Sequence, residues 1–387
     1  MASNCVASTS IGCLFCCQGC NAEKLRNDFT FLPPVPSYQV EGAAEGGRAG
    51  KLQFVLEALR SFSFYQQAAE HAEVHFVQTG RGERIPVVWV RNSAASTAGS
   101  PGGSSRSGQQ PLVLLHCHGN ATDIGMMMAA YFEMTRQLGC EVVGVEYSGY
   151  GASSGKPSAC NTLADAEAAY NFVVSSGVPP ERIIAYGQSV GSGPAMALAA
   201  RKPMGGVVLH SPMLSGIRVI DPQPDSCCRP SCVFWCFDFF RNDKHIKAVK
   251  CPVFVMHGRM DDVIPLYHGV RLSEAAPKDC RWPGYFPKDA GHNDIIERNS
   301  AAYFGEVCAF LRSVQERVDG SGASLIGKPA QMKMVEVAAK GQGGTARPYA
   351  EPMVGPEDGR YESIRRAGGR TQGGSREGHG DSQAALD

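Results

Sequence analysis

The chain has 387 residues, and its 37 basic side chains balance 37 acidic ones, so its formal net charge is +0. That balance gives no positive field for nucleic acid, and no nucleic-acid partner is expected. No apolar run approaches the ~20 residues of a membrane-spanning helix, and the first residues lack the basic start and apolar core of a secretory signal. The 15 cysteines are therefore expected to be reduced cytosolic thiols, not a disulfide framework.

The beginning of the chain is rich in cysteine and then irregular. Five cysteines lie within residues 1–20: Cys5, Cys13, Cys16, Cys17 and Cys20. A proline-containing stretch at 31–36 is typical of an extended segment, and 41–50 is a Gly/Ala-rich linker. Residues 51–70 are interpreted as a short helix or an irregular lead-in.

Two β-type runs follow, at 73–77 and 85–90, separated by a glycine-bearing turn. Together they predict an antiparallel hairpin. Residues 92–110 contain mainly Ser, Gly and Ala with almost no large apolar side chain, which predicts a flexible insert.

From residue 112 short apolar runs alternate with helical periods. Strands are expected at 112–115, 141–145, 182–186, 206–209, 252–256 and near 282–286. Helices are expected at 125–138, 161–175, after 191, around 268–275 and at 301–318. This alternation predicts an α/β fold with a mostly parallel, doubly wound sheet, whose active centre lies at the carboxyl ends of the strands.

These segments predict four parts. They are a Cys-rich N-terminal segment, 1–40; a linker and lead-in, 41–70; an α/β domain, 71–318, with the insert 92–110 and a Cys- and aromatic-rich, lid-like insert, 219–240; and a tail, 319–387. The tail is rich in Gly, Ser and charge and poor in aromatic residues, so it is expected to be mostly disordered.

A Gly-x-Ser-x-Gly pattern at 187–191 follows the expected strand 182–186 and precedes a run of small, helix-forming residues. Strand, tight turn and helix are the context of a nucleophile elbow, so Ser189 is the candidate nucleophile. The same pattern occurs at 151–155, where Lys156-Pro157 follows. Proline disfavours helix at the residue before it, and this copy is interpreted as a glycine-rich loop.

A serine hydroxyl needs a base to take its proton and an acid to orient that base. In this architecture the order along the chain is Ser, acid, His, so both partners are sought after Ser189. His292 is the candidate base, because it lies in a small glycine-bearing loop, 289–294, before the last expected helix. His257 ends a strand directly before a glycine and is interpreted as a turn or core histidine.

Two adjacent carboxylates follow the strand expected at 252–256. Asp261 is the preferred acid, because the first acidic residue after such a loop tends to turn inward. Asp262 would then be a solvated side chain or a helix N-cap. The residues alone leave both assignments open, although the loop after the preceding strand offers no carboxylate before Asp221.

The oxyanion of an acyl-transfer intermediate needs two backbone N–H donors. Val190, directly after the nucleophile, is expected to supply one, and Asn120, in the loop after the first parallel strand, the other. His116 and His118 suggest a metal site, but they lack an obvious further pair of ligands, so no metal is predicted. The chemistry calls for no cofactor.

Several further stretches can be compared with known families. They are Cys13-Leu14-Phe15-Cys16-Cys17, Phe31-Leu32-Pro33-Pro34, His118-Gly119-Asn120-Ala121, Tyr147-Ser148-Gly149-Tyr150-Gly151, Tyr186-Gly187-Gln188-Ser189-Val190-Gly191, Leu209-His210-Ser211-Pro212, His257-Gly258 with Asp261, and Gly291-His292-Asn293-Asp294. With them the chain resembles the α/β-hydrolase superfamily, and within it the group called α/β-hydrolase domain-containing protein 17, which are membrane-bound protein depalmitoylases. The cysteine cluster followed by the Phe-Leu-Pro-Pro segment narrows the likeness to this group.

The resemblance covers roughly residues 10–316 and implies an α/β-hydrolase fold with Ser189 as nucleophile, Asp261 as acid and His292 as base. It implies a serine hydrolase that removes long-chain acyl thioesters, such as S-palmitoyl groups, from protein cysteines through an acyl-enzyme. A general lipase or carboxylesterase, and a non-catalytic hydrolase-like scaffold, stay open as alternatives. The insert 92–110, an enlargement at 222–236 and the tail have no clear family counterpart.

The resemblance also implies that the first cysteines carry acyl chains and anchor segment 1–40 to the membrane. The candidates are Cys13, Cys16, Cys17 and Cys20. Two or more chains give stable anchoring where one is marginal, and Ala2 stands where a myristoylation signal needs glycine. A zinc knuckle and plain reduced thiols are the alternatives. The expected partners are S-acylated membrane proteins and the lipid surface, on the cytoplasmic face of the plasma membrane, endosomal membranes or both.

Overall fold

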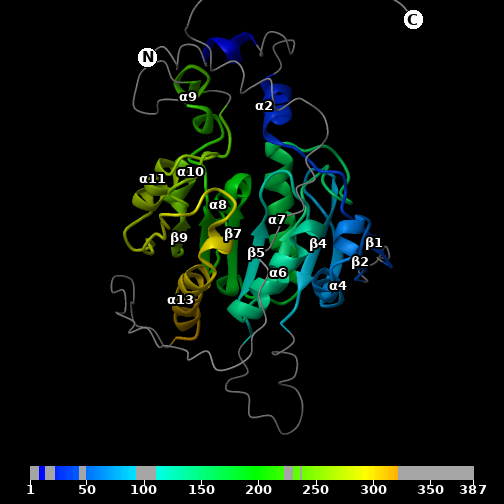
Figure 1. The fold of residues 1–387 in the computed structure, drawn as a ribbon. Helices are drawn as coiled ribbons and strands as arrows, with labels where there is room; N and C mark the ends of the chain where they lie inside the picture. The colour runs from blue at the N-terminus through cyan, green and yellow to red at the C-terminus, as the bar shows by residue number, and fades with distance from the viewer. Residues whose placement is uncertain are drawn as a thin grey trace, which may run out of the picture. The chain divides into compact units, whose positions relative to one another are not determined.

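The computed structural model describes residues 8–13, 22–42, 49–92, 110–221, 230–235 and 238–320, all within one compact unit, Met1–Gln342. Its centre is a seven-stranded sheet with the strand order β3-β4-β6-β5-β7-β8-β9 (Figure 1). The predictions for residues 93–109 of the flexible insert and 321–387 of the tail lie outside the described residues.

One edge of this sheet is antiparallel. β3 (Ala72–Gln78) and β4 (Arg84–Val90) form the predicted hairpin, and Gly82 in its turn has a φ of 87°. β4 also pairs antiparallel with β6 (Glu141–Val145). The hairpin therefore extends the sheet beyond its parallel part.

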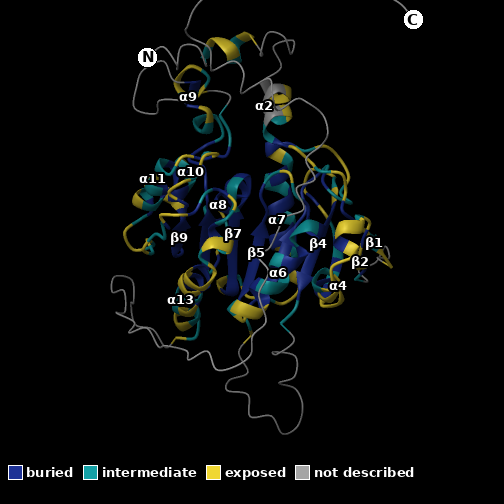
Figure 2. Cartoon of the chain, viewed as in Figure 1, coloured by how far each residue is buried: buried dark blue, intermediate teal, exposed yellow. Residues whose placement is uncertain are grey.

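The remaining strands are parallel to β6 and to one another. They are β5 (Val113–Cys117), β7 (Ile183–Gln188), β8 (Gly206–His210) and β9 (Val253–Met256). Nearly every residue in them is buried, as expected for parallel strands covered on both faces. Figure 2 shows this sheet as the buried centre of the protein. The predicted α/β-hydrolase architecture is confirmed.

Helices cover both faces. They are α6 (Ile124–Leu138), α7 (Ala159–Ser175), α8 (Ser192–Ala199), α11 (Tyr267–Ala275), α12 (Ile295–Arg298) and α13 (Ser300–Val318). Strand residues alternate between two hydrophobic clusters, so that Leu115 packs with α7 and α8, while Leu114 packs with α6 and α13. Asp123 and Ser158 cap α6 and α7 by accepting hydrogen bonds from backbone N–H groups.

The region before the hairpin is more regular than expected. After α2 (Ala22–Thr30), β1 (Tyr38–Glu41) pairs antiparallel with β2 (Lys51–Phe54), and α3 (Glu57–Arg60) and α4 (Ser63–Glu70) follow. Short helices thus occur within 51–70, where a short helix or an irregular lead-in is expected, whereas the pairing of β1 with β2 is not predicted. Residues 43–48 of the expected linker lie outside the described residues. Leu52 and Phe54 alternate with exposed residues and enter the core, but four residues of alternation are a weak sequence signal.

The lid-like insert contains short helices in its described part. η4 (Ile217–Ile220) and α9 (Pro230–Val233) lie in or beside it, and α10 (Asn242–His245) and η6 (Ile246–Ala248) follow. The strand expected near 282–286 is not a regular strand. Only isolated bridges form there, at Arg281 and Tyr285, because Pro283 between them has no N–H to donate. No described helix is both long and apolar enough to cross a membrane.

Candidate active site

Ser189 lies where β7 ends, in the short helical turn η3 (Ser189–Gly191), directly before α8. Its φ of 51° is in the left-handed region, which non-glycine residues seldom occupy. This strained strand–turn–helix geometry is that of the predicted nucleophile elbow. The second Gly-x-Ser-x-Gly copy forms turns and bends before α7, as predicted, with Ser153 in an irregular loop.

The two glycines of the elbow leave room for this turn. A Cβ on Gly187 would lie 2.6 Å from the carbonyl oxygen of Gly191, and one on Gly191 would lie 2.6 Å from the carbonyl oxygen of His118 and overlap that of Cys117. These neighbours are backbone atoms that cannot rotate away. The motif therefore requires glycine at both positions for packing reasons.

Replacing Gly191 by alanine is expected to lower the free energy of unfolding by about 1–3 kcal/mol or more, because the methyl group collides with backbone. Gly305→Ala, in α13, is the matched control, since its Cβ would meet nothing within 4 Å. Alanine there should raise stability by about 0.8–1 kcal/mol. Urea denaturation of both variants measures the difference, and equal midpoints would contradict this reading of the motif.

The structure brings the three predicted residues together. His292 Nε2 lies 2.9 Å from Ser189 Oγ, and His292 Nδ1 lies 2.7 Å from Asp261 Oδ2. A carboxylate only accepts, so Nδ1 carries the hydrogen and Nε2 is left to accept the serine hydroxyl proton. His292 is 8% exposed, so this chain of hydrogen bonds is largely shielded from water.

The surroundings of Asp261 stabilise its ionised form. Its Oδ1 accepts from the backbone N–H groups of Val263 (3.0 Å) and Ile264 (2.7 Å). Burial alone raises its pKa, but hydrogen bonds from His257, His292 and the Ile264 backbone outweigh burial and hold the pKa well below the usual range. The adjacent Asp262 is exposed, and its side chain is solvated as expected.

His257 is a further neighbour of the site, beyond the three residues predicted to form it. It is fully buried, and its Nε2 lies 3.0 Å from Asp261 Oδ2 and 2.7 Å from the carbonyl oxygen of Ile264. The interpretation as a core histidine was therefore incomplete, because the ring also touches the acid. Its place at the end of β9, four residues before Asp261, was the available signal.

The loop after β5 lies beside the nucleophile. A Cβ on Gly119 would be 3.9 Å from the Cβ of Ser189. His118 Nδ1 donates to the carbonyl oxygen of Gly119 at 2.8 Å, and in a trans peptide the N–H of Asn120 then points the opposite way. Among the described residues that N–H has no hydrogen-bond partner. Val190 lies in the first turn of η3, where N–H groups lack intrahelical acceptors.

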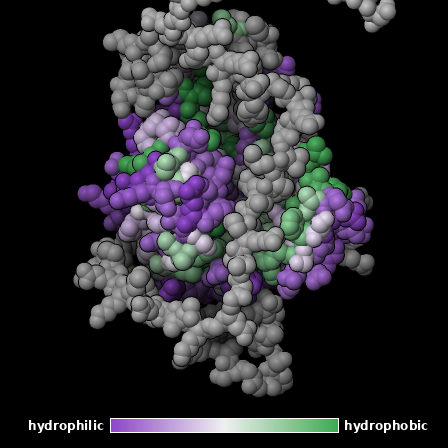
Figure 3. All heavy atoms as spheres, viewed as in Figure 1, coloured by the Kyte–Doolittle hydropathy of each residue, from purple (hydrophilic) through white to green (hydrophobic). Residues whose placement is uncertain are grey.

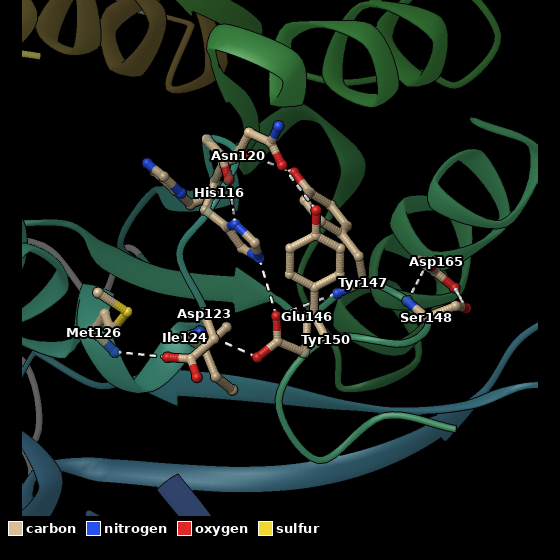
Figure 4. A network of polar contacts seen from close by, with 12 residues as sticks. His116, Asn120, Asp123, Ile124, Met126, Glu146, Tyr147, Ser148, Tyr150 and Asp165 are labelled. Atoms are coloured by element: carbon tan, nitrogen blue, oxygen red, sulfur yellow. Dashed lines mark hydrogen bonds and ion pairs between the residues drawn. The ribbon is translucent and has the colours of Figure 1, made fainter. Parts of the chain in front are cut away.

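A buried polar network supports this loop (Figure 4). Glu146 Oε1 lies 3.0 Å from His118 Nε2, while Glu146 Oε2 accepts from the backbone N–H of Ile124. Burial raises the pKa of Glu146, although the His118 hydrogen bond opposes the rise. Tyr147 donates to the carbonyl oxygen of His118 at 2.7 Å. The peptide groups around Gly119 are thus fixed from several sides.

The arrangement has the parts needed for acyl transfer: a strained serine, an oriented imidazole, an ionised acid and two candidate backbone donors for an oxyanion. Within the described residues, no group of three or more His, Cys, Asp or Glu side chains is arranged to hold a metal ion. Of the predicted acylation sites, Cys13 is an exposed free thiol, and Cys16, Cys17 and Cys20 lie outside the described residues.

Two curated relatives are similar to most of this chain. The chain is 34% identical over 295 residues to α/β-hydrolase domain-containing protein 17B of Homo sapiens, covering 76% of this chain and 92% of that protein. It is 36% identical over 311 residues to α/β-hydrolase domain-containing protein aho-3 of Caenorhabditis elegans, covering 80% and 83%. A family model described as serine aminopeptidase, S33, matches residues 108–226. A solved esterase of Pyrococcus furiosus aligns with a TM-score of 0.49 and 15% identity over 73% of this chain and 97% of that one.

Proposed function

This chain belongs to the α/β-hydrolase domain-containing protein 17 family, and from that premise we propose that it is a membrane-associated serine hydrolase that removes long-chain acyl groups, such as palmitoyl, from protein cysteines. The observation that carries the proposal is the continuous hydrogen-bonded series Ser189–His292–Asp261 at a strained elbow. Such a series activates a hydroxyl for attack on an acyl carbon.

In the proposed reaction Ser189 Oγ attacks the thioester carbonyl carbon while His292 Nε2 takes the hydroxyl proton. The N–H groups of Val190 and Asn120 stabilise the resulting oxyanion. When the intermediate collapses, the C–S bond breaks, and His292 returns the proton to the departing cysteine sulfur. Water, deprotonated by His292, then attacks the acyl carbon. The bond from that carbon to Ser189 Oγ breaks, His292 returns the proton to Oγ, and the fatty acid is released. Asp261 holds the imidazolium in place throughout.

The substrate class is tested by comparing two kinds of acyl donor. A palmitoylated cysteine peptide and a glycerol ester of the same chain length are offered to the purified protein, and a fluorophosphonate probe reports whether Ser189 is reactive. The proposal expects labelling and a higher kcat/KM for the thioester peptide. A preference for the glycerol ester would identify a general lipase or carboxylesterase, and no labelling would identify a non-catalytic scaffold.

Exposed apolar side chains in the lid-like insert and beside Asp261 suit a lipid-linked substrate. Figure 3 shows hydrophilic side chains over much of the described surface on one face, with apolar ones in its upper part and along its right side. Large exposed apolar residues lie in or beside the lid-like insert and around Asp261: Ile220, Val233, Trp235, Met260 and Val263. These side chains support a site that binds acyl chains or contacts a bilayer surface.

Replacing Cys13, Cys16, Cys17 and Cys20 together by serine is expected to move the protein from membranes to the soluble fraction. Each buried methylene of an acyl chain contributes about 0.8 kcal/mol, so two or more chains anchor stably and none leaves weak contact. Activity on a soluble ester should persist, while activity on membrane-bound substrates should fall, because surface attachment raises effective concentration.

Fractionation of cells that express the quadruple variant measures this effect. Cys160→Ser is the matched control, since Cys160 is also an exposed free thiol but lies in α7. The control should stay with membranes. A quadruple variant that stays there too would place the anchor elsewhere in the chain.

A further inference from the structure

The side chain of Asn120 makes three hydrogen bonds, although the proposed reaction uses only the backbone of this residue. Its Oδ1 accepts from the backbone N–H of Leu32 at 3.0 Å and from the hydroxyl of Tyr150 at 2.9 Å. Its Nδ2 donates to the carbonyl oxygen of Thr30 at 2.7 Å. Figure 4 shows the Asn120 side chain beside the tyrosine rings, above the carboxylate of Glu146.

Two of these three partners belong to a segment almost ninety positions earlier in the chain. Residues 30–38 connect α2 to β1. The end of this segment makes further hydrogen bonds to residues that follow β5 and β6. The Ser37 backbone N–H and hydroxyl both donate to the Asp123 carboxylate, and Tyr38 donates to Glu146 Oε2 at 2.9 Å. The segment is therefore hydrogen-bonded to Asn120 near its start and to Asp123 and Glu146 near its end.

Packing adds to these hydrogen bonds. Phe31, between the two backbone partners of Asn120, is only 4% exposed and meets Phe240 edge-on with 6.3 Å between ring centroids. Phe240 itself lies against Gly193, four residues after the nucleophile. Residues 30–32 thus bridge the Asn120 loop and the start of α8.

Two sets of hydrogen bonds fix the orientation of the Asn120 backbone N–H. The peptide that contains it is held by His118 through the Gly119 carbonyl, and the residue itself is held by its side-chain amide. A donor that is fixed before the oxyanion forms needs no reorganisation during the reaction. Losing either restraint lets the N–H turn away from the developing charge.

We propose that Asn120 is a positioning residue that uses the N-terminal segment 30–38 to hold one oxyanion donor in place. The segment that joins the cysteine cluster to the fold is then required for turnover itself, and not only for location. The inference rests on the proposed serine hydrolase function, but it does not depend on the thioester substrate, because any ester forms the same oxyanion.

Asn120→Ala tests this directly, because alanine keeps the backbone N–H and removes all three side-chain contacts. With a soluble ester as substrate, kcat should fall about 10- to 100-fold while KM stays within about twofold. Inhibition by a trifluoromethyl ketone, whose adduct with Ser189 carries an oxyanion, should weaken by the same factor as kcat. Amide hydrogen exchange at Leu32 should become faster.

A matched pair of tyrosine variants separates positioning from general stability. Tyr150→Phe removes one partner of Asn120, whereas Tyr170→Phe removes a similar hydrogen bond, 2.7 Å long, to the Pro203 carbonyl away from the site. Both should lower the unfolding midpoint, but only Tyr150→Phe should lower kcat. Equal kcat values in the two, or full kcat in a folded Asn120→Ala variant, would overturn the proposal.

Failure of the proposed function gives a different result. A wild-type protein that cleaves the ester but no acyl-cysteine peptide would refute the thioester assignment and leave the Asn120 comparison intact. A wild-type protein that cleaves neither substrate would refute both, since no oxyanion would then need a donor. Full turnover by Asn120→Ala beside an active wild type would refute the positioning role alone.

Discussion

The Ser189→Ala variant is expected to lose about 10⁶-fold in kcat on both esters and thioesters, which removes all measurable turnover. No other group in the site can take the place of the hydroxyl, because His292 and Asp261 act only through it. The substitution should not harm the fold, because alanine and serine have a similar energetic cost in the left-handed backbone conformation that this position already adopts. Steady-state hydrolysis and fluorophosphonate labelling measure the loss.

The chain contains its own control for this experiment. Ser153 stands in the second Gly-x-Ser-x-Gly copy, where no helix follows directly. Ser153→Ala should therefore keep wild-type kcat and full labelling. If Ser189→Ala turned over substrate normally, the nucleophile would have to be sought elsewhere, and the elbow would be a structural turn only.

The second large effect concerns the two adjacent carboxylates. Asp261→Asn is expected to lower kcat about 10⁴-fold, because an amide cannot hold the imidazole in the tautomer that accepts the serine proton. Asp262→Asn should change kcat by less than about twofold, since an exposed side chain without a role in the series contributes little. Kinetics of both variants on the same soluble ester give the comparison.

The Asp261 variant also separates orientation from stability. The carboxylate of Asp261 accepts hydrogen bonds from two backbone groups and faces two imidazoles, so its replacement should lower the unfolding midpoint as well. Activity must therefore be measured well below that midpoint. Small and equal losses in the Asp261 and Asp262 variants would mean that another group orients His292.

The strands, the elbow and the order of Ser189, Asp261 and His292 could be predicted because each depends on a local pattern. Periodicity marks a strand within a few residues, and one glycine on each side marks the elbow. The side-chain contacts of Asn120 could not be predicted, because its partners at Thr30 and Leu32 are main-chain atoms far away in sequence. Any residue type at those two positions offers the same carbonyl, and all but proline the same N–H.

Two other differences have similar causes. The small sheet of β1 and β2 could not be predicted, because its strands are only four residues long and they pair across a Gly/Ala-rich stretch. The role of His257 was missed because a histidine beside a glycine resembles an ordinary turn residue. Only the three-dimensional arrangement places its ring on the carboxylate of Asp261.

The left-handed backbone of Ser189 also has an evolutionary consequence. A non-glycine residue in that conformation costs of order 1 kcal/mol or more, and glycine would adopt it without that penalty. If selection acted only on the stability of the fold, replacement of Ser189 by glycine would therefore be favoured. A chain that keeps serine there accepts a less stable native state in exchange for a reactive group, a trade between stability and activity located at one residue.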